Sequence, residues 1–73
     1  MPLFVQVTAQ FRPSRQPPRV VDLAEGSTVA DLLRAVGQSA DSTLVVRGPD
    51  PIPESEALRA GETLVLLSAF SGG

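Results

Sequence analysis

The stretch from Gly26 to Gly37 decides the fold, and it reads G-S-T-V-A-D-L-L-R-A-V-G. Its apolar side chains recur at the spacing of one helical face, at Val29, Leu32, Leu33 and Val36. Thr28 and Asp31 have the spacing of a capping box, and Gly37 stands where a left-handed residue ends a helix. The pattern therefore predicts a helix from about Thr28 to Val36. A helix this short is marginal alone, so it must pack on other elements.

Extended segments precede this helix. Residues 3–8 read L-F-V-Q-V-T and alternate in character, with Leu3, Val5 and Val7 on one face. That period of two, in residues that favour strands, predicts a strand with one buried face. Residues 20–23, V-V-D-L, predict a second strand. The intervening residues 10–19 carry three prolines, which cannot donate to a β-ladder, so we expect a loop there.

The segments after the helix are also extended. Leu44–Arg47 predicts a third strand, and the prolines of residues 51–53 permit at most a short edge segment. In residues 54–62 we expect one tight turn that places Leu58 in the core. Residues 63–69 predict the last strand.

This order of elements defines a fold class. Strand, strand, helix, strand, short strand and strand, in a chain of 73 residues, predict an α+β protein with a mixed sheet and one main helix. The first and last strands would be adjacent and parallel, which is the β-grasp or ubiquitin-like arrangement. We expect residues 1–69 to form a single domain and residues 70–73 a flexible C-terminal diglycine tail.

Composition argues against several classes of function. The chain contains no cysteine and no histidine, so it offers neither thiolate chemistry nor the commonest general base and metal ligand, and we predict no metal site. Its net charge of -2 favours neither nucleic acid nor an anionic membrane as a direct partner. No apolar run is long enough to span a bilayer. We expect a non-catalytic cytoplasmic protein.

Four short motifs resemble the ubiquitin-like sulfur carriers and small modifiers, which include ThiS, MoaD, TtuB and the archaeal and eukaryotic ubiquitin-related modifiers. Gly26–Leu33 is similar to the family's helix entry, and Ala60–Leu64 to its approach to the last strand. Ser68–Gly73 is most similar to the TtuB tail, while Ala9–Arg12 resembles the start of MoaD-like proteins. The resemblance spans essentially the whole chain.

The resemblance implies that the working group is the Gly73 carboxylate. In this family an ATP-dependent activating enzyme adenylates that carboxylate, and a sulfur donor such as a cysteine desulfurase or a rhodanese-like protein converts it to a thiocarboxylate. The sulfur then passes to an accepting enzyme such as a tRNA thiolase, and some members are also joined to protein lysines. The chain would be a protein cosubstrate rather than an enzyme. It would bind no cofactor, since ATP is used by the activating enzyme.

Gly72 and Gly73 suit this chemistry. Without side chains, they can pass in extended form through a narrow catalytic channel. The alternative interpretation of the pair is a frayed chain end.

The last strand predicts a docking surface. If Leu64 and Leu66 face the core, then Val65 and Leu67 face outward, where other apolar residues can join them. We hypothesise that four residues dock the activating enzyme: Phe4, Val65, Leu67 and Phe70. Ordinary scatter of surface hydrophobes, or a reversed register that buries these residues, are the alternatives.

Charged residues are harder to assign from the sequence. All six basic residues are arginine, and lysine is absent. Three arginines near the proline-rich loop fit either a solvated loop or a contact with an acidic groove on a partner: Arg12, Arg15 and Arg19. Arg47 and Arg59 are candidates to flank the tail. We interpret three glutamates as a solvated face: Glu54, Glu56 and Glu62.

Three functions therefore stay open. The first is a sulfur carrier for tRNA 2-thiouridine synthesis that is also conjugated to proteins. The second is a sulfur carrier for the molybdenum cofactor or for thiamine. The third is a non-covalent β-grasp interaction module, because a fold alone does not define a function.

Overall fold

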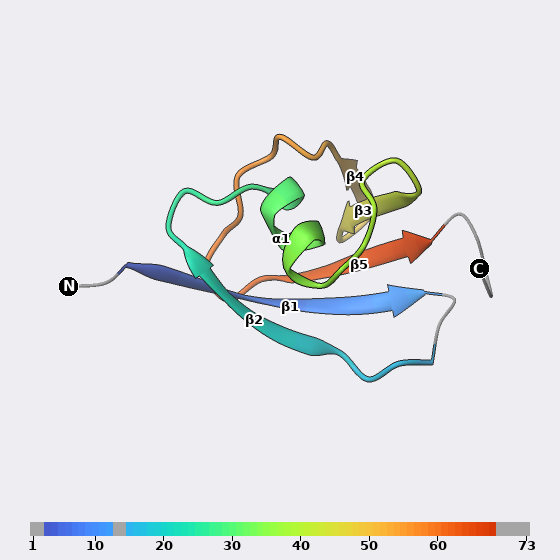
Figure 1. Ribbon diagram of the computed structural model, residues 1–73, viewed down its shortest axis with the longest axis horizontal. Coiled ribbons are helices and arrows are strands. Elements are labelled where there is room, and N and C mark those ends of the chain that lie inside the picture. Colours follow the sequence, from blue (N-terminus) through green and yellow to red (C-terminus); the bar gives the residue numbers. More distant parts are fainter. Residues whose placement is uncertain (1–2, 13–14, 69–73) are drawn as a thin grey trace.

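The computed structural model describes residues 3–12 and 15–68 (Figure 1). Its elements follow one another along the chain in the predicted order. They are β1 (Phe4–Arg12), β2 (Arg19–Ala24), α1 (Val29–Ala35), β3 (Thr43–Arg47), β4 (Asp50–Ile52) and β5 (Thr63–Ser68).

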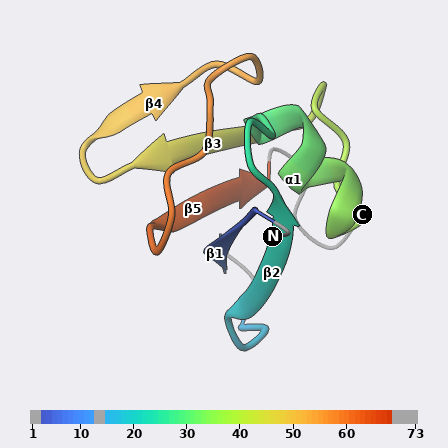
Figure 2. The ribbon, with the colours of Figure 1, turned by 90° about the vertical axis from the view of Figure 1, so that its left-hand side faces the viewer.

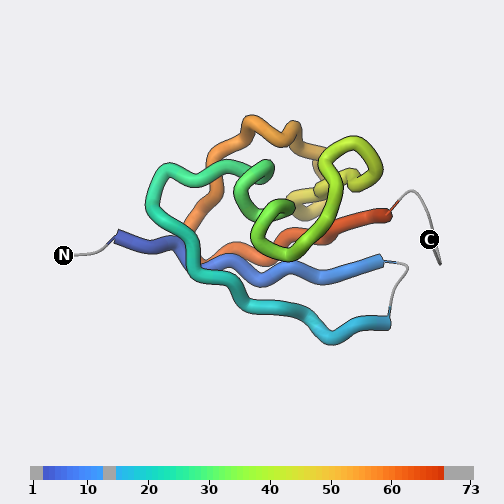
Figure 3. Tube along the Cα trace, viewed as in Figure 1, coloured from blue at the N-terminus to red at the C-terminus, as the bar shows by residue number. Residues whose placement is uncertain are grey.

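The strands form one five-stranded sheet in the order β2-β1-β5-β3-β4. β1 and β5 are adjacent and parallel, and every other neighbouring pair is antiparallel. Figure 3 shows these two strands running side by side in the same direction. The single helix lies across one face of the sheet, as the end-on view in Figure 2 shows. The α+β, β-grasp prediction is confirmed.

Helix α1 begins and ends as the sequence predicts. The Asp31 carboxylate accepts the backbone N–H of Thr28 at 2.9 Å, which completes one side of the capping box. At the other end Gly37 has a φ of +77°, a value that residues with a Cβ rarely adopt. The N–H groups of Gly37 and Gln38 donate to the carbonyls of Arg34 and Leu33, which is the Schellman arrangement.

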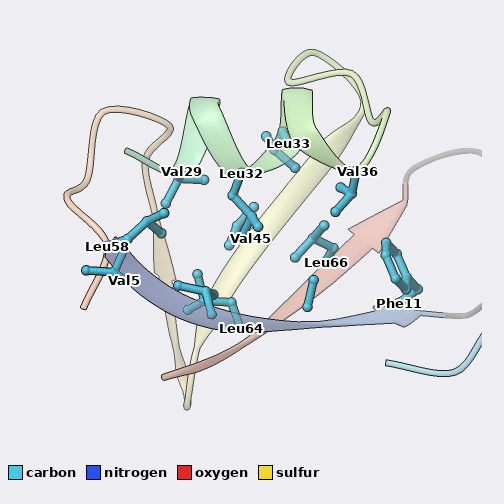
Figure 4. Packing of buried hydrophobic residues seen from close by; sticks show 12 residues of the cluster. Val5, Phe11, Val29, Leu32, Leu33, Val36, Val45, Leu58, Leu64 and Leu66 are labelled. Atoms are coloured by element: carbon cyan, nitrogen blue, oxygen red, sulfur yellow. The ribbon is translucent and has the colours of Figure 1, made fainter. Parts of the chain in front are cut away.

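The core lies between α1 and the inner face of the sheet (Figure 4). Along β1 every second side chain is buried, which produces the alternation predicted for a strand with one buried face. The core residues from the helix and from the other strands meet this row. The buried set is Val5, Val7, Ala9, Phe11, Val29, Leu32, Leu33, Val36, Val45, Leu58, Leu64 and Leu66.

Strand β1 is longer than predicted. Residues 10–12 were expected to lie in the loop, but they continue the strand and pair with β5 after the pairing with β2 has ended at Ala9. Phe11, in the middle of this extension, is buried in the core. Its partner, Leu66, is more than fifty residues away in the sequence, so local patterns carry no information about the extension.

The segment between β4 and β5 also differs from expectation. Leu58 is buried as predicted, and its N–H donates to the carbonyl of Ser27 at 2.9 Å. However, the segment makes two turns rather than one, because Glu56 N–H donates to Pro53 and Glu62 N–H donates to Arg59. Between these turns Ala57 bridges to Thr28 at the helix start, which holds the segment against the domain.

Within residues 3–12 and 15–68, no helix has the length and apolar character needed to cross a membrane.

Candidate functional site

Strand β5 leads toward the predicted reactive end of the chain. It is the central strand of the sheet and is hydrogen-bonded to β1 on one side and to β3 on the other. Its inward side chains, Leu64 and Leu66, are almost completely buried. The last described residue of the strand, Ser68, lies opposite Thr43. The polypeptide that precedes the diglycine is therefore fixed to the core up to Ser68, while Phe70, Gly72 and Gly73 lie outside the described residues.

The outward side chains of β5 join those of β3 on the face that α1 does not cover. Val65 lies opposite Val46, and Leu67 lies opposite Leu44. Leu44 is 52% exposed, and the other three residues are half-buried. We call these four residues, Leu44, Val46, Val65 and Leu67, the outer strip. The predicted outward direction of Val65 and Leu67 is confirmed, and the reversed register is excluded.

Phe4 lies on the same outer face, but far from the outer strip. It is 62% exposed and pairs with Ala24 at the beginning of β1. Gln10, which is the β1 partner of Val65, comes six residues later, or about 20 Å along a strand. Of the four docking residues predicted from the sequence, three are described, and Phe4 is therefore not contiguous with Val65 and Leu67.

A shallow hollow borders the outer strip where β5 ends. It has a volume of about 420 Å³ and is lined by Asp41, Ser42, Thr43, Leu44, Leu67 and Ser68. Its lining combines the apolar pair of the outer strip with the polar turn before β3.

Three arginines lie in and beside the connection between β1 and β2. Because β1 and β5 are parallel, the β1–β2 connection begins beside the end of β5. Arg12 lies directly opposite Leu67, and Arg15 lies in the connection. Arg19 opens β2 opposite Ala9, which itself pairs with Leu64 near the start of β5. We call these three exposed residues the basic corner. In the described part of the chain they form no ion pair.

Arg47, a candidate to flank the tail, lies at the far end of β5 from Ser68. It closes β3 near the start of β5. Its guanidinium donates to Glu62 Oε1 and to Glu56 Oε2, each at 2.8 Å, and to the carbonyl of Ala57 at 3.0 Å. This is a structural clamp on the segment between β4 and β5.

The clamp also corrects the interpretation of the glutamates. Only 12% of the Glu62 side chain is exposed, so Glu62 is not on a solvated face. Burial alone would raise the pKa of Glu62, but hydrogen bonds from the Arg47 side chain and the Arg59 N–H outweigh burial and lower it. The hydrogen bonds that Arg47 donates to Glu62 and Glu56 raise the pKa of Arg47, so Arg47 and Glu62 both stay charged. Sequence reasoning missed this contact because the partners are nine and fifteen residues apart.

Arg59 is the other candidate for flanking the tail. Its backbone N–H donates to Glu62 Oε2 at 2.6 Å, which places it beside the residue that precedes β5. Arg59 therefore lies at the opposite end of β5 from Ser68. The tail lies outside the described residues, so its position relative to Arg59 stays a prediction.

The parallel pairing of β1 with β5, the single covering helix and the central last strand define a ubiquitin-like β-grasp protein. The model of the ThiS family matches residues 5–73, and the chain belongs to that family. The match includes the end of the chain and covers nearly its whole length. Comparison with curated proteins found no match.

Solved structures show the same fold at low sequence identity. Caldiarchaeum subterraneum ubiquitin is 15% identical, with a TM-score of 0.73 over 96% of this chain and 99% of that one. The ubiquitin-like domain of Arabidopsis thaliana protein At2g32350 is 10% identical, with a TM-score of 0.73 over 97% and 83% of the two chains. A ubiquitin-like domain from tubulin-binding cofactor B is 17% identical, with a TM-score of 0.64 over 100% and 98%.

Proposed function

We propose that the chain is a sulfur carrier whose Gly73 carboxylate is adenylated by an ATP-dependent activating enzyme and then converted to a thiocarboxylate. A cysteine desulfurase or a rhodanese-like protein supplies the sulfur, and a tRNA thiolase that makes 2-thiouridine receives it. The same activated end is also joined to lysines of target proteins. In this proposal the chain is a cosubstrate and performs no catalysis itself.

The observation that carries the proposal is the family match through residue 73 on a ubiquitin-like fold. A carboxylate is a poor electrophile until a good leaving group such as AMP is attached, so a carrier of this kind needs an activating partner. The central position of β5 supports the proposal as well. This position joins the predicted reactive end to a strand with neighbours on both sides, so that a partner can hold the domain while it reacts with the end.

The outer strip supports a docking role for β5. Leu44 and Leu67 form an apolar pair beside the hollow at the end of the strand, and exposed apolar pairs of this kind favour a protein partner. We propose that Val65, Leu67 and Phe70 contact the activating enzyme. Phe4 belongs to the same contact only if the partner also covers the far end of the sheet, about 20 Å from Val65.

Intact-mass spectrometry tests the central step. The purified chain is incubated with ATP, cysteine and an extract of the source cells, and its mass is compared before and after. Replacement of one terminal oxygen by sulfur is expected, and removal of Gly73 should abolish the shift. A chain that gains no sulfur and forms no adenylate under any of these conditions would instead be a non-covalent interaction module.

A second candidate function is sulfur transfer to the molybdenum cofactor or to thiamine. The ThiS family match supports it equally, because the carrier chemistry is the same and the recipient differs. The MoaD-like motif Ala9–Arg12 does not choose between them, since Ala9 and Phe11 are core positions of β1. Deletion of the gene, followed by assays of thiolated tRNA, molybdoenzyme activity and thiamine requirement, separates the recipients.

A further inference from the structure

The two edges of the sheet differ in how open they are to another strand. One edge is β4, which has only three residues and contains Pro51. Short length and proline both discourage pairing at a sheet edge. The other edge is β2, which has six residues and no proline. Figure 2 shows these two strands at opposite borders of the sheet. Of the two, β2 is the edge that can accept another strand.

The backbone groups that β2 presents at this edge follow from its pairing with β1. Glu25 continues the register of the pair, and its N–H donates to the carbonyl of Leu3 at 2.8 Å, so these residues are a hydrogen-bonded pair. Such pairs alternate along an antiparallel ladder with pairs that exchange no hydrogen bond. The N–H and C=O groups of Val20, Asp22 and Ala24 therefore point away from β1, toward the open edge.

Strand β1 shows the same alternation from its other side. Thr8 lies opposite Val20, and its N–H donates to the carbonyl of Glu62 rather than to β2. Among the described residues, the open edge has one backbone hydrogen bond, from Ser27 N–H to the carbonyl of Ala24 at 3.0 Å. A carbonyl oxygen has two lone pairs, so this one can accept again. The edge is therefore ready to form a further ladder.

Two exposed side chains of opposite charge mark the ends of this edge. Arg19 opens β2, and Glu25 directly follows its last residue. They share the alternation of Val21 and Leu23, which pack against the core, so both lie on the helix side of the sheet. They are about 20 Å apart along the strand, and neither forms an ion pair within the described part of the chain. They are too far apart to pair within one chain, but they can pair with an antiparallel copy.

We propose that the open edge of β2 binds β2 of a second copy of this chain, antiparallel and about a twofold axis at Asp22. In this register Val20 exchanges hydrogen bonds with the partner's Ala24, and Asp22 does so with the partner's Asp22. Each backbone group that points to the edge then has a partner. The two sheets join into one, and both helices lie on the same side of it.

The same register matches the side chains on the helix side. Arg19 lies opposite the partner's Glu25 at each end of the pairing. Between these ends Val21 lies opposite the partner's Leu23, so that half-buried apolar side chains cover each other. A shift of two residues preserves the hydrogen-bond alternation but sets Arg19 against Leu23 or Ser27 instead. Charge complementarity therefore selects this register, and it selects a second copy as the occupant.

One contact opposes the association. The two Asp22 side chains face each other on the outer side of the sheet, and like charges directly opposite in a ladder are destabilising. Two pairs of opposite charge and two apolar pairs act against this single repulsion. We therefore expect a weak and reversible dimer whose affinity is limited by Asp22.

The dimer leaves the outer strip open in both copies. Pairing at β2 extends the sheet sideways and covers neither of its faces, and β5 is two strands away from the interface. The inference goes beyond the proposed function and does not depend on it. A failure of adenylation in the cell extract would leave the association unchanged.

Sedimentation equilibrium of the 73-residue chain measures the association. We expect a monomer–dimer equilibrium with a dissociation constant of about 1 mM or less. Arg19→Glu and Glu25→Arg should each weaken it at least ~10-fold, because either change turns both pairs of opposite charge into pairs of like charge. Asp22→Asn should strengthen it about 3-fold, because it removes the central repulsion.

A mixture of the two charge variants is the sharpest test. Arg19→Glu and Glu25→Arg each repel their own copies, but a mixed dimer has opposite charges at both ends. The mixture should therefore associate within ~3-fold of the parent chain. Arg59→Glu and Glu54→Arg are the matched controls, since they make the same changes of charge at exposed positions between β4 and β5. Each control alone, and their mixture, should associate like the parent.

Amide hydrogen exchange followed by NMR locates the interface. The N–H groups of Val20, Asp22 and Ala24 should gain protection as the concentration rises from micromolar to millimolar. Three results would overturn the inference: parent and Asp22→Asn both monomeric at about 1 mM, a mixture no tighter than its components, or a dimer without protection at these three amides. Circular dichroism confirms that the compared variants are folded.

Discussion

Leu44 on β3 and Leu67 on β5 lie directly opposite each other on the face of the sheet that the helix leaves open. The pair lines the hollow at the end of β5, and Leu44 remains 52% exposed. Arg12 lies on the other side of Leu67. Leu67, one of the last described residues before the diglycine, therefore has an apolar neighbour on one side and a positive charge on the other.

Replacing Leu67 by Asp should slow activation of Gly73. A charge in the middle of a desolvated apolar contact costs at least ~1.4 kcal/mol of binding, which corresponds to a tenfold lower rate at limiting concentration. The measurement is the initial rate of thiocarboxylate formation in the cell extract. Leu44→Asp should act similarly, with less effect on the fold because Leu44 is more exposed.

Val20→Asp is the matched control for this substitution. Val20 is 61% exposed and lies on the edge strand β2, two strands away from β5. We expect an unchanged rate for this variant and an unchanged melting temperature. Equal rates for Leu67→Asp and the parent chain would show that the outer strip is not the docking surface.

Loss of the Glu62 carboxylate charge should destabilise the domain at neutral pH. Glu62→Gln leaves Arg47 with a single carboxylate partner, Glu56, and weakens a charged hydrogen bond worth about 1–3 kcal/mol. Urea unfolding followed by circular dichroism measures the difference. A glutamate on a fully solvated face would instead tolerate this change within ~0.5 kcal/mol.

The pH dependence of that difference follows from the direction of the Glu62 pKa shift. The folded-state pKa is lowered below the ordinary value of 4.5, so the folded domain favours the charged form. The stabilisation is fully present above pH 4.5 and is lost as the pH falls through the folded-state pKa. Parent and Glu62→Gln stabilities should therefore converge in acid, and a gap that stayed constant from neutral pH into acid would contradict the assignment.

Leu32→Ala should cost about 2–5 kcal/mol of unfolding free energy. Leu32 is completely buried at the centre of the contact between α1 and the sheet, where the neighbours cannot close the space left by the side chain. Urea unfolding provides the value. Ala35→Gly, at an exposed position of the same helix, is the comparison and should cost no more than ~1 kcal/mol.

Conjugates of this chain should carry it singly at each site. Growth of a lysine-linked chain requires an acceptor lysine on the protein already attached, and none of the 73 residues is lysine. Tryptic mapping of conjugates purified through an affinity tag without lysine measures this directly. A peptide of this protein branched at one of its own side chains would contradict the expectation, whereas linkage through an α-amino group would not.

Local patterns were sufficient for the helix and for the order of the strands, but not for the full length of β1. The i, i+3, i+4 spacing from Val29, the capping pair Thr28 and Asp31 and the stop at Gly37 are all short-range features, and the structure confirms each of them. The alternation of Leu64 and Leu66 with Val65 and Leu67 likewise predicted which side of β5 is buried. These features depend on residues at most a few positions apart, so the sequence displays them directly.

Long-range contacts could not be predicted in this way. The extension of β1 to Arg12 depends on pairing with β5, and the Arg47 clamp depends on carboxylates from a segment without regular structure. The same is true of the distance between Phe4 and Val65. Both face outward by the same alternation, but only the register of the parallel pair places them at opposite ends of the sheet.

By itself the sequence determined the order of the elements, the buried side of the first and last strands and the absence of any amine among the side chains. Only the tertiary structure decided that Arg12 lies beside the end of β5. It also decided that Arg47 binds Glu62 at the opposite end of that strand. The physical reason is that periodicity acts within a few residues along the chain. The position of a charge relative to the reactive end depends instead on strand order and register, which arise when distant segments bury their apolar faces together.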